Sequence, residues 1–565
     1  MNLMSTEIWG VILMFVATIL LAIPLGKYIA NVFSDKPGFS DKIFGPIEKV
    51  IMRLSGVDYK KEMTWKEHMV ALLTINLVWF VIGMLILMFQ ANLPLNPDGN
   101  PNMSADLAFN TVISFLVNCN LQHYSGETGV SYFSQTGLMF LQFVSSGIGI
   151  SAAIVLFRAF KGKGTRLFGN FYDVFLKSCT RILLPISFIV ALILVFEGTP
   201  MTYEGKDTIM NLQGDTVEVS RGPAAAFIAI KHVGTNGGGF FGTNSSHPLE
   251  NPSYISNIAE MIGQFVVPVA MVFALGFYIK RRKLSMMIFG VMTFGFLCLA
   301  VPNVLMEIQG SPAIERLGVT QDLGAMEGKE IRLGSAASGF WSIVTTVIST
   351  GSVNSMHDSS MPLSGMNEML AMMINAFYGG NGVGILNFFI FIILGVFISG
   401  LMVGRTPEFM GKKVEAREMK IAMMVALIHP FLILAGTAFA AAFPSVGAST
   451  TNDPGFHGLS EMLYEYTSAS ANNGSGFEGL GDNTMWWNVS TGIVLLFGRF
   501  IPIVGPVAIA GILSEKRYIP EGAGTLKTDT ASFGFMVFAV IAIIAALAFF
   551  PALTLGPIAE YFSIK

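Results

Sequence analysis

Residues 234–244, GTNGGGFFGTN, form a glycine-rich stretch in a chain whose overall composition is 52% hydrophobic. Each glycine costs an α-helix roughly 0.8–1 kcal/mol relative to alanine, so a stretch with this many glycines does not continue a helix. The sequence therefore predicts a break in the backbone here, flanked by Asn and Thr side chains. The function of such a break must be inferred from the rest of the sequence.

The composition is that of a membrane protein. Only 13% of the 565 residues are charged, whereas soluble proteins have roughly 25%. The apolar runs 8–25, 72–89 and 531–550 approach or reach the roughly 20 residues that cross a bilayer. We therefore expect an all-α polytopic membrane protein in a lipid bilayer. The net charge of −3 gives no indication of a nucleic-acid partner.

The positive charges alternate between loops. Of the 34 Lys and Arg residues, 26 fall in the segments 27–66, 158–181, 280–283, 405–420 and 516–527. The positive-inside rule places these segments on the cytoplasmic side and both termini outside. The ten predicted spans that join the loops are 7–30, 68–89, 134–158, 176–196, 255–280, 284–306, 375–403, 419–442, 485–512 and 530–552.

Four outer loops contain a short helical stretch that is followed at once by small and polar residues. The helical parts have roughly 10–13 residues, which is too short to span a bilayer and is typical of re-entrant segments. The loops are 106–122, 223–239, 338–354 and 459–476. Aligning their breaks gives four triplets: Asn118-Cys119-Asn120, Thr235-Asn236-Gly237, Ser349-Thr350-Gly351 and Asn472-Asn473-Gly474.

The triplets organise the chain into a single transmembrane domain, 1–565, with four parallel repeats of span, pore helix, loop and span. The repeats cover about 68–158, 176–280, 284–403 and 419–512, with an extra first span at 7–30 and a last span at 530–552. The third triplet position is Gly in three repeats and Asn in one. These residues adopt positive φ most readily, so we expect the same backbone turn at this position in every repeat.

Non-helical backbone at membrane depth is tolerated only where it is buried in protein or lines a watery cavity. Four such loops around one axis can present rings of carbonyl oxygens that replace the water shell of a cation. The triplets contain no carboxylate, so they suit a large monovalent ion better than calcium or magnesium. The sequence therefore predicts a cation filter. The alternatives are a phosphate-binding loop, for which GxxxxGK[ST] is missing, and glycines that only permit close helix packing.

Several longer motifs resemble a known family. NCNLQHYSGE (118–127), HVGTNGGGFFGTNSSHPLENP (232–252), VNSMHDSSMPLSGM (353–366), SASANNGSGF (468–477) and GRTPEFMGKK (404–413) resemble the potassium-binding subunit of the bacterial Kdp potassium-transporting ATPase. The resemblance covers essentially the whole chain. It implies a single-chain, potassium-channel-like pore in the bacterial plasma (inner) membrane, with a high-affinity potassium filter on the outer side. The filter residues that it implies are the four triplets and Gln122.

The resemblance also implies the energy source. The chain has neither a Walker A nor a DKTG sequence, so on its own it is expected not to be an enzyme. A partner P-type ATPase catalytic subunit would use ATP, and small membrane subunits would complete the complex. Potassium is the transported ion, and no covalently bound cofactor is expected. The alternatives are a stand-alone potassium channel or ion-coupled potassium transporter of the same superfamily, and a secondary transporter for an organic solute.

Two features of the spans leave alternatives open. Arg499 lies inside an apolar span, where a charge costs roughly 2.5–3.5 kcal/mol and usually faces a cavity or partner. It is either an electrostatic gate below the filter or a structural arginine that bonds helix carbonyls. The stretch NAFYGGNGVG (375–384) interrupts the seventh span. It indicates either a mobile element of the conduction path or close packing.

Flanking residues give two weaker expectations. Three histidines lie near the predicted filter, and we expect them to bond loop carbonyls in preference to sensing pH; they are His232, His247 and His357. The cytoplasmic stretch 405–420 carries five basic and three acidic residues. We expect it to be exposed and to meet the partner ATPase, with ordinary positive-inside anchoring as the alternative.

Overall fold

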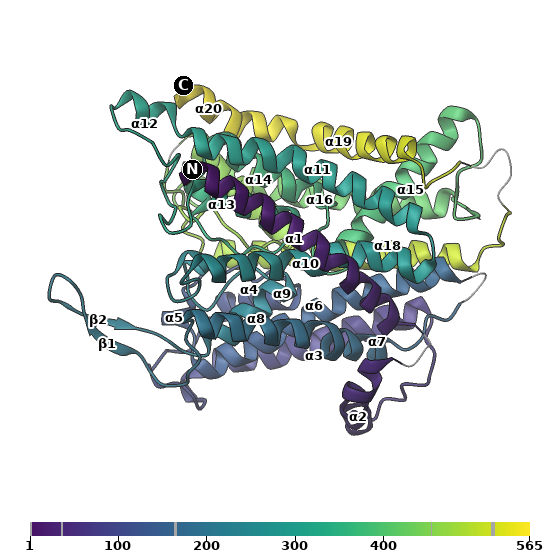
Figure 1. Ribbon diagram of the computed structural model, residues 1–565, viewed down its shortest axis with the longest axis horizontal. Coiled ribbons are helices and arrows are strands. Elements are labelled where there is room, and N and C mark those ends of the chain that lie inside the picture. The colour runs from purple at the N-terminus through teal and green to yellow at the C-terminus, as the bar shows by residue number, and fades with distance from the viewer. Residues whose placement is uncertain (1–2, 35–37, 163–165, 454, 521–525, 565) are drawn as a thin grey trace.

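The computed structural model describes residues 3–34, 38–162, 166–453, 455–520 and 526–564. Within these ranges, ten helical segments are long and apolar enough to cross a membrane, which confirms the predicted number of spans. They lie side by side along the long axis of the molecule (Figure 1). The segments are α1 (Leu3–Val32), α3 (Trp65–Met88), α6 (Tyr132–Lys161), α7–η2–α8 (Phe171–Lys177, Ser178–Leu183, Leu184–Glu197), α10 (Tyr254–Ile279), α11 (Arg282–Gln309), α15 (Val383–Val403), α16 (Ala416–Ala442), α18 (Met485–Glu515) and α19 (Ala531–Leu553).

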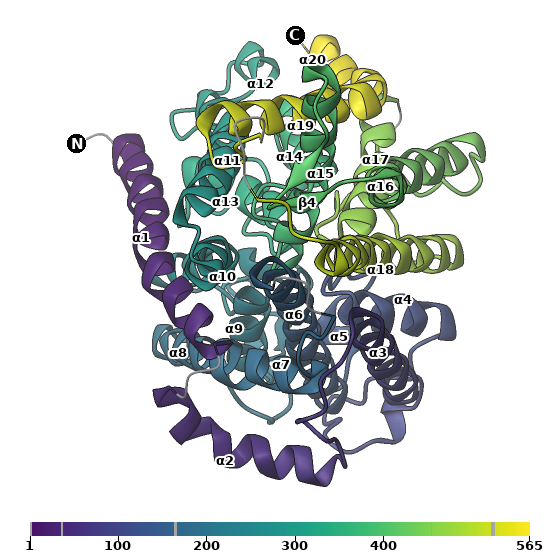
Figure 2. The same ribbon diagram turned by 90° about the vertical axis from the view of Figure 1, so that its right-hand side faces the viewer.

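The ten segments form an inner and an outer set. In α6, α10, α15 and α18, between 67% and 89% of the most apolar window is buried. In the other six, which are α1, α3, α7–α8, α11, α16 and α19, that share is only 22% to 56%. Apolar side chains that are exposed along a span suit contact with lipid. The inner set therefore forms the core, and the outer set surrounds it, as the end-on view shows (Figure 2).

Four short helices lie between an outer span and the inner span that follows it. Each is followed directly by one of the triplets, so the order of span, short helix and span occurs four times along the chain. The short helices are α4 (Ala105–Leu116), α9 (Ala224–Gly234), α13 (Ser335–Val347) and α17 (Phe456–Ala471). We call these helices, together with the loops that follow them, the short-helix layer.

The interruption predicted at 375–384 of the seventh span is confirmed, since 375–382 are not helical, but the helix α14 (Pro362–Ile374) that precedes them was not predicted. Glycine alone does not cause this break, because Asn375 and Tyr378 also have positive φ, at 43° and 64°. The N–H of Asn375 still donates to the carbonyl of Ala371, and its left-handed conformation then turns the following backbone away from the helical path. We call 375–382 the break.

The remaining elements lie at the two ends of the molecule. Both termini and the hairpin of β1 (Asp207–Met210) and β2 (Thr216–Val219) lie at one end, and α2 (Phe39–Leu54) lies at the other (Figure 1). Residues 35–37, 163–165 and 521–525 of three predicted cytoplasmic loops fall outside the described ranges. The other elements are β3 (Glu408–Phe409), β4 (Lys412–Lys413), η1 (Gln90–Asn92), α5 (Gly126–Gly129), η3 (Asn244–Ser246), α12 (Pro312–Arg316), η4 (His357–Ser359), η5 (Thr554–Ile558) and α20 (Ala559–Ile564).

Candidate functional site

All four short helices end in the same way. The N–H of the second triplet residue donates a hydrogen bond to the carbonyl five residues earlier, and each of these bonds is 2.9 Å long. This is the Schellman arrangement, which satisfies carbonyls that a helix leaves unpaired at its C-terminus. The four donor–acceptor pairs are Cys119–Ser114, Asn236–Lys231, Thr350–Thr345 and Asn473–Ser468. The polar triplets thus begin where the helices end.

The left-handed residue that the triplets share is the first one. Its φ lies between 51° and 64° in every triplet, at Asn118, Thr235, Ser349 and Asn472. At the third position φ is positive in Asn120, Gly351 and Gly474 but not in Gly237. The predicted common turn at the third position is therefore wrong for the second triplet. A β-branched residue such as Thr235 is strained in this conformation, which the surrounding contacts must maintain.

The first and second triplets are hydrogen-bonded to each other. The N–H groups of Gly237 and Gly238 donate to the carbonyls of Cys119 and Asn120, both at 2.8 Å. The side-chain amide of Asn118 donates to the carbonyl of Thr235, also at 2.8 Å. A carbonyl has two lone pairs, so the carbonyls of Cys119 and Asn120 bond the neighbouring loop and retain a second lone pair for a ligand.

Glycine is required where the loops approach one another. A Cβ on Gly237 would lie 2.5 Å from the carbonyl oxygen of Cys119 and 2.8 Å from the Cα of Gly474. A Cβ on Gly351 would overlap the carbonyl of Asn473. Close-packed interiors do not absorb such contacts without a shift of the backbone. The four triplets, which are far apart in sequence, therefore meet in one place.

Three side-chain oxygens beside the triplets have no hydrogen-bond partner among the described residues. They are Oε1 of Gln122, Oδ1 of Asn236 and Oγ1 of Thr350, and all are buried. The amide nitrogen of Gln122 donates to the carbonyl of Gly239 at 3.1 Å, which leaves its oxygen for another group. Buried polar atoms normally have partners. Neutral oxygens of this kind, together with carbonyls, suit a monovalent cation.

Arg499 lies close to the break. The residue is 6% exposed. Among the described residues its guanidinium makes no hydrogen bond or ion pair, so the helix-carbonyl bonds that a structural arginine would make are missing. A Cβ on Gly149 of α6 would lie 3.3 Å from Nη2 of Arg499 and would overlap the carbonyl of Asn381. Arg499 therefore packs beside α6 and the break.

The break is attached to the triplets. The N–H of Asn381 donates to Oγ1 of Thr235 at 3.2 Å, and its side-chain amide donates to the carbonyl of Val233 at 2.8 Å. The hydroxyl of Ser349 donates to Oδ1 of Asn375 at 3.0 Å. The sequence singled out the break by its glycines and missed these two asparagines. A pair of amide side chains in a glycine-rich break was the available signal.

Buried ion pairs surround the short helices. Lys231, in the last turn of α9, forms an ion pair with Glu250, and both side chains are fully buried. Lys329 and Glu307 form a second buried pair, at 2.8 Å. Charged groups in a low-dielectric interior require such partners. None of these four residues was predicted as part of the site, because each lies outside the triplets in sequence.

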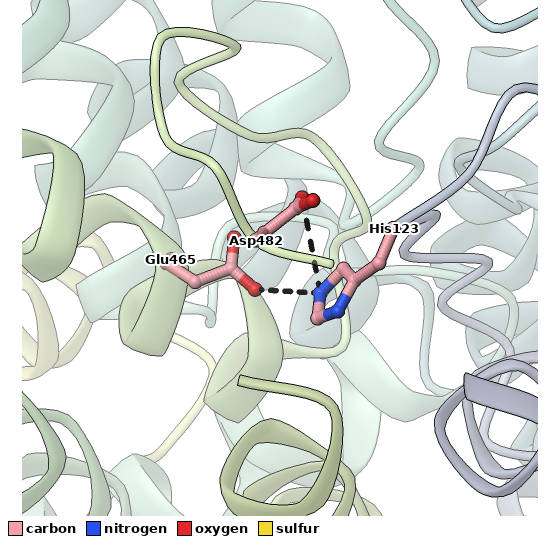
Figure 3. A group of neighbouring side chains, drawn as sticks. All are labelled: His123, Glu465 and Asp482. Atoms are coloured by element: carbon pink, nitrogen blue, oxygen red, sulfur yellow. Dashed lines mark hydrogen bonds and ion pairs between the residues drawn. The ribbon is translucent and has the colours of Figure 1, made fainter. Parts of the chain in front are cut away.

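A third charged group joins distant parts of the chain (Figure 3). His123 follows the first triplet, Glu465 lies on α17 and Asp482 follows the fourth triplet. Nε2 of His123 lies 3.1 Å from Glu465 and 3.9 Å from Asp482. Burial opposes protonation of the imidazole, but Asp482 and Glu465 outweigh this effect and raise the pKa of His123 to about 9. Two acidic residues in a short re-entrant helix, Glu461 and Glu465, were the available signal for Glu465.

The expectation that the other histidines bond loop carbonyls is not confirmed. His232 bonds the carbonyl of Ile228 at 2.9 Å, but that carbonyl belongs to its own helix, α9. His357 instead bonds the hydroxyl of Tyr464 at 2.8 Å, and His247 stacks on Phe241 with the ring centroids 4.0 Å apart.

The stretch 405–420, predicted to be cytoplasmic, is less exposed than expected. Lys412 is only 6% exposed, and it donates to the carbonyl of Lys516 at 2.5 Å. Glu418 is fully buried and pairs with Lys516 at 2.8 Å. The turn between β3 and β4 has positive φ at both Met410 and Gly411, which gives a tight two-residue hairpin. The stretch therefore packs against the residues that follow α18, through the contacts of Lys412 and Glu418 with Lys516.

Comparison with known proteins is consistent with this fold. The chain matches the model of the KdpA family, potassium-transporting ATPase A subunit, over residues 12–562. It is 67% identical to the potassium-transporting ATPase potassium-binding subunit of Flavobacterium psychrophilum over the whole of both chains. It is 46% identical to the protein of the same name from Geobacillus kaustophilus over 98% of each chain.

A solved structure has a related fold. The potassium transporter TrkH from Vibrio parahaemolyticus aligns with a TM-score of 0.53 over 89% of this chain and 98% of that chain. The two sequences are 13% identical, so this likeness concerns the fold alone. The family match, in contrast, covers nearly the whole chain and agrees with relatives aligned over their full length. The protein belongs to the KdpA family of potassium-transporting ATPase A subunits.

Proposed function

We propose that this chain is the potassium-binding and potassium-translocating subunit of an ATP-driven, high-affinity potassium uptake pump. Potassium is selected at the four triplets and passed to a partner P-type ATPase catalytic subunit, which uses ATP. Small membrane subunits complete the complex, and no bound cofactor takes part. The complex lies in the bacterial plasma membrane, with both termini outside.

The observation that carries this proposal is the meeting of the four triplets. Each is placed by an identical helix end, which directs the partial negative charge of a helix C-terminus toward the same region. The proposed ligands are carbonyl and side-chain oxygens of the triplets and of Gln122. Thr350 and Asn236 supply buried oxygens without other partners among the described residues. The family names of full-length relatives favour the pump subunit over a stand-alone channel.

Beyond the triplets, we propose that the ion leaves sideways. Arg499 lies beside α6 and the break, and its positive charge interacts with Cys119 of the first triplet, so it would repel a cation that continued straight past the triplets. A cavity of about 60 Å³ lies between α14, α15, α16, α18 and α19, lined in part by Asn375, Asn387, His429 and Ser470. The rest of its lining is mostly apolar, and these four polar residues mark the lateral route that we propose.

A pair of Thr→Val variants tests the filter. Thr350→Val removes a buried, unpaired hydroxyl at nearly constant volume. In the assembled complex, loss of one ligand oxygen should raise the potassium concentration for half-maximal ATPase stimulation by roughly tenfold, which corresponds to about 1.4 kcal/mol. Sodium should also compete better.

Thr18→Val is the matched control, because the Thr18 hydroxyl is buried but donates to the carbonyl of Met14 in its own helix. Its potassium dependence should be that of the wild type. An unchanged half-maximum in Thr350→Val, at normal abundance of the complex, would exclude Thr350 from the filter. Potassium-stimulated ATP hydrolysis by the chain without any partner would contradict the subunit assignment itself.

A further inference from the structure

His123, Glu465 and Asp482 come from three separate segments, and their donor atoms converge on one point (Figure 3). His123 lies in the loop after the first triplet, and Asp482 in the loop after the fourth. The imidazole and the carboxylate of Glu465 are buried, whereas the side chain of Asp482 is 29% exposed. The cluster is therefore built inside the protein and reached from one side.

A chain of hydrogen bonds fixes the tautomer of His123. The amide nitrogen of Asn488 donates to Asp106 at 2.8 Å, because an ionised carboxylate can only accept. The amide oxygen of Asn488 then faces Nδ1 of His123 at 2.7 Å and accepts its proton. A neutral imidazole has one N–H, so in that state Nε2 carries a lone pair.

That lone pair faces Oε1 of Glu465 at 3.1 Å. Two lone pairs do not remain at this distance unless a proton or a metal ion lies between them. A proton on Nε2 can form a hydrogen bond only with Glu465, because Oδ2 of Asp482 lies 3.9 Å from Nε2, which is too far for a hydrogen bond. A metal ion would bond both carboxylates and the imidazole.

The distances and charges suit a divalent transition metal. Two ligands that each lie about 2.1 Å from a zinc ion are separated by roughly 3–4 Å, the range seen between the imidazole and each of the two carboxylates. A neutral imidazole, two carboxylates and a divalent cation sum to zero charge, whereas an imidazolium leaves one negative charge buried. Nδ1–H of His123 donates to the amide oxygen of Asn488, and metal-binding histidines usually have such a hydrogen-bond partner at the ring nitrogen that does not bind the metal.

We propose that His123, Glu465 and Asp482 bind one divalent transition-metal ion, with zinc as the probe, and that this ion weakens potassium binding at the adjacent triplets. The nitrogen ligand excludes the alkali and alkaline-earth ions, which prefer oxygen alone. Replacing one proton by a divalent ion adds a unit of positive charge near the triplets. That charge repels potassium.

A second cluster, on α17, has a similar set of donor atoms. Nε2 of His457 faces Asp358 at 3.0 Å, Nδ1 faces Glu560 at 3.0 Å, and Glu461 lies close enough to complete a group that could bind a metal ion. The control is therefore a histidine outside both clusters. Nε2 of His68 faces the carbonyl of Gly169 at 2.9 Å, and His68 belongs to no such group among the described residues.

The experiment measures zinc binding by the purified, assembled complex, prepared without a histidine tag, by equilibrium dialysis. Wild type should bind one more zinc ion than His123→Gln, and this ion should be lost from Asp482→Asn as well. Removing one ligand should weaken binding by about 100-fold or more, since even second-shell changes cost about 10–100-fold. His68→Gln should bind zinc as the wild type does.

Asp482→Asn keeps the proposal testable if His123→Gln does not assemble. The Asp482 side chain is partly exposed, and asparagine has nearly the same size and shape as aspartate. Zinc should also raise the potassium concentration for half-maximal ATPase stimulation by about three- to tenfold in wild type and His68→Gln. Identical zinc binding by wild type and Asp482→Asn would overturn the site. Zinc binding that leaves the potassium dependence unchanged would overturn its effect on potassium.

Discussion

The short-helix layer and the break hold their buried charges in opposite ways. Around the short helices the positive groups are paired: Lys231 with Glu250, and Lys329 with Glu307. Beside the break, Arg499 has no ion-pair partner among the described residues, and its guanidinium and the main-chain carbonyl of Asn381 both approach Gly149 of α6.

This difference separates two uses of a buried charge. A paired charge has little net field, so it acts by fixing the position of the groups that it joins. An unpaired cation contributes little to structure, but it repels other cations across several ångströms of low-dielectric interior. We therefore expect substitutions in the short-helix layer to change stability and potassium affinity, and substitutions at Arg499 to change leakage.

The largest effect is expected from Glu250→Gln. Lys231 would keep its charge without a carboxylate, and uncompensated buried charges cost about 3–5 kcal/mol. Thermal unfolding of the detergent-solubilised complex should show this loss. The control is Glu218→Gln, which removes the partner of Lys206 in an exposed pair at 3.7 Å. Exposed pairs contribute about 0–1 kcal/mol, so equal losses in both variants would contradict the comparison.

Gly351→Ala is expected to have the next largest effect, on potassium affinity. The φ of Gly351 is 82°, and a Cβ there would overlap the carbonyl of Asn473. The left-handed conformation alone costs about 1–2 kcal/mol for a residue other than glycine. The potassium concentration for half-maximal ATPase stimulation should rise by about tenfold or more.

Gly290→Ala provides the control for Gly351→Ala, since Gly290 lies in α11 and a Cβ there would meet nothing within 4 Å. Alanine is the better helix former, so this variant should keep the wild-type potassium dependence. If Gly351→Ala also kept it, the close approach of the third and fourth triplets would have no role in potassium binding.

Arg499→Gln should change stability little but raise passive rubidium flux by several-fold in the absence of ATP, because a barrier of one charge is removed. Arg181→Gln is the matched control: Arg181 pairs with Asp41 at 2.7 Å and with Glu48 at 2.5 Å. This variant should lose stability and should not leak. A leak of the same size in both variants would show that the flux reports general damage to the protein.

The smallest effect is a pH dependence at His457, which joins α17 to Glu560 of α20. Burial opposes its protonation, but Asp358 and Glu560 outweigh this effect and raise its pKa to about 10 from the ordinary 6.5. The charged ring therefore stabilises the fold fully below about pH 6.5, and this contribution is lost as the pH rises through about 10.

The melting temperature of wild type should therefore fall more between pH 7 and pH 10 than that of His457→Gln, by about a few degrees. Parallel pH profiles for the two proteins would show that His457 contributes no pH-dependent stability.

Much of the fold was predictable because its signals are local. A run of apolar residues long enough to cross a bilayer identifies a span wherever it packs. A short apolar helix followed by small polar residues identified each of α4, α9, α13 and α17 in advance. The same approach found the interruption within 375–384 but missed the helix α14 that precedes it and the positive φ of Asn375 and Tyr378. Neighbouring loops hold Asn375 in place there, and one chain segment gives no sign of them.

The candidate site was predicted only in part. The residues of the triplets follow from their composition, since Asn, Thr, Ser and Gly end helices and expose carbonyls. The shared left-handed residue was assigned to the third position by glycine preference, whereas the structure places it at the first. Gly237 is needed for its close contact with Cys119 and not for its φ. Glycine tolerates both a positive φ and a close contact with neighbouring backbone. Which of the two a given glycine is needed for depends on how the surrounding loops pack.

The sequence by itself determined the membrane class, the number of spans and the position of the four triplets, because each depends on residues close together in the chain. Only the tertiary structure decided which groups face one another. His123 meets Glu465 across 342 residues and Asn488 across 365. The break reaches Thr235 across 146. Such contacts depend on how the ten spans pack against one another. Packing decides which atom faces the Nε2 lone pair of His123, whether Arg499 has a partner, and whether a glycine has room for a Cβ.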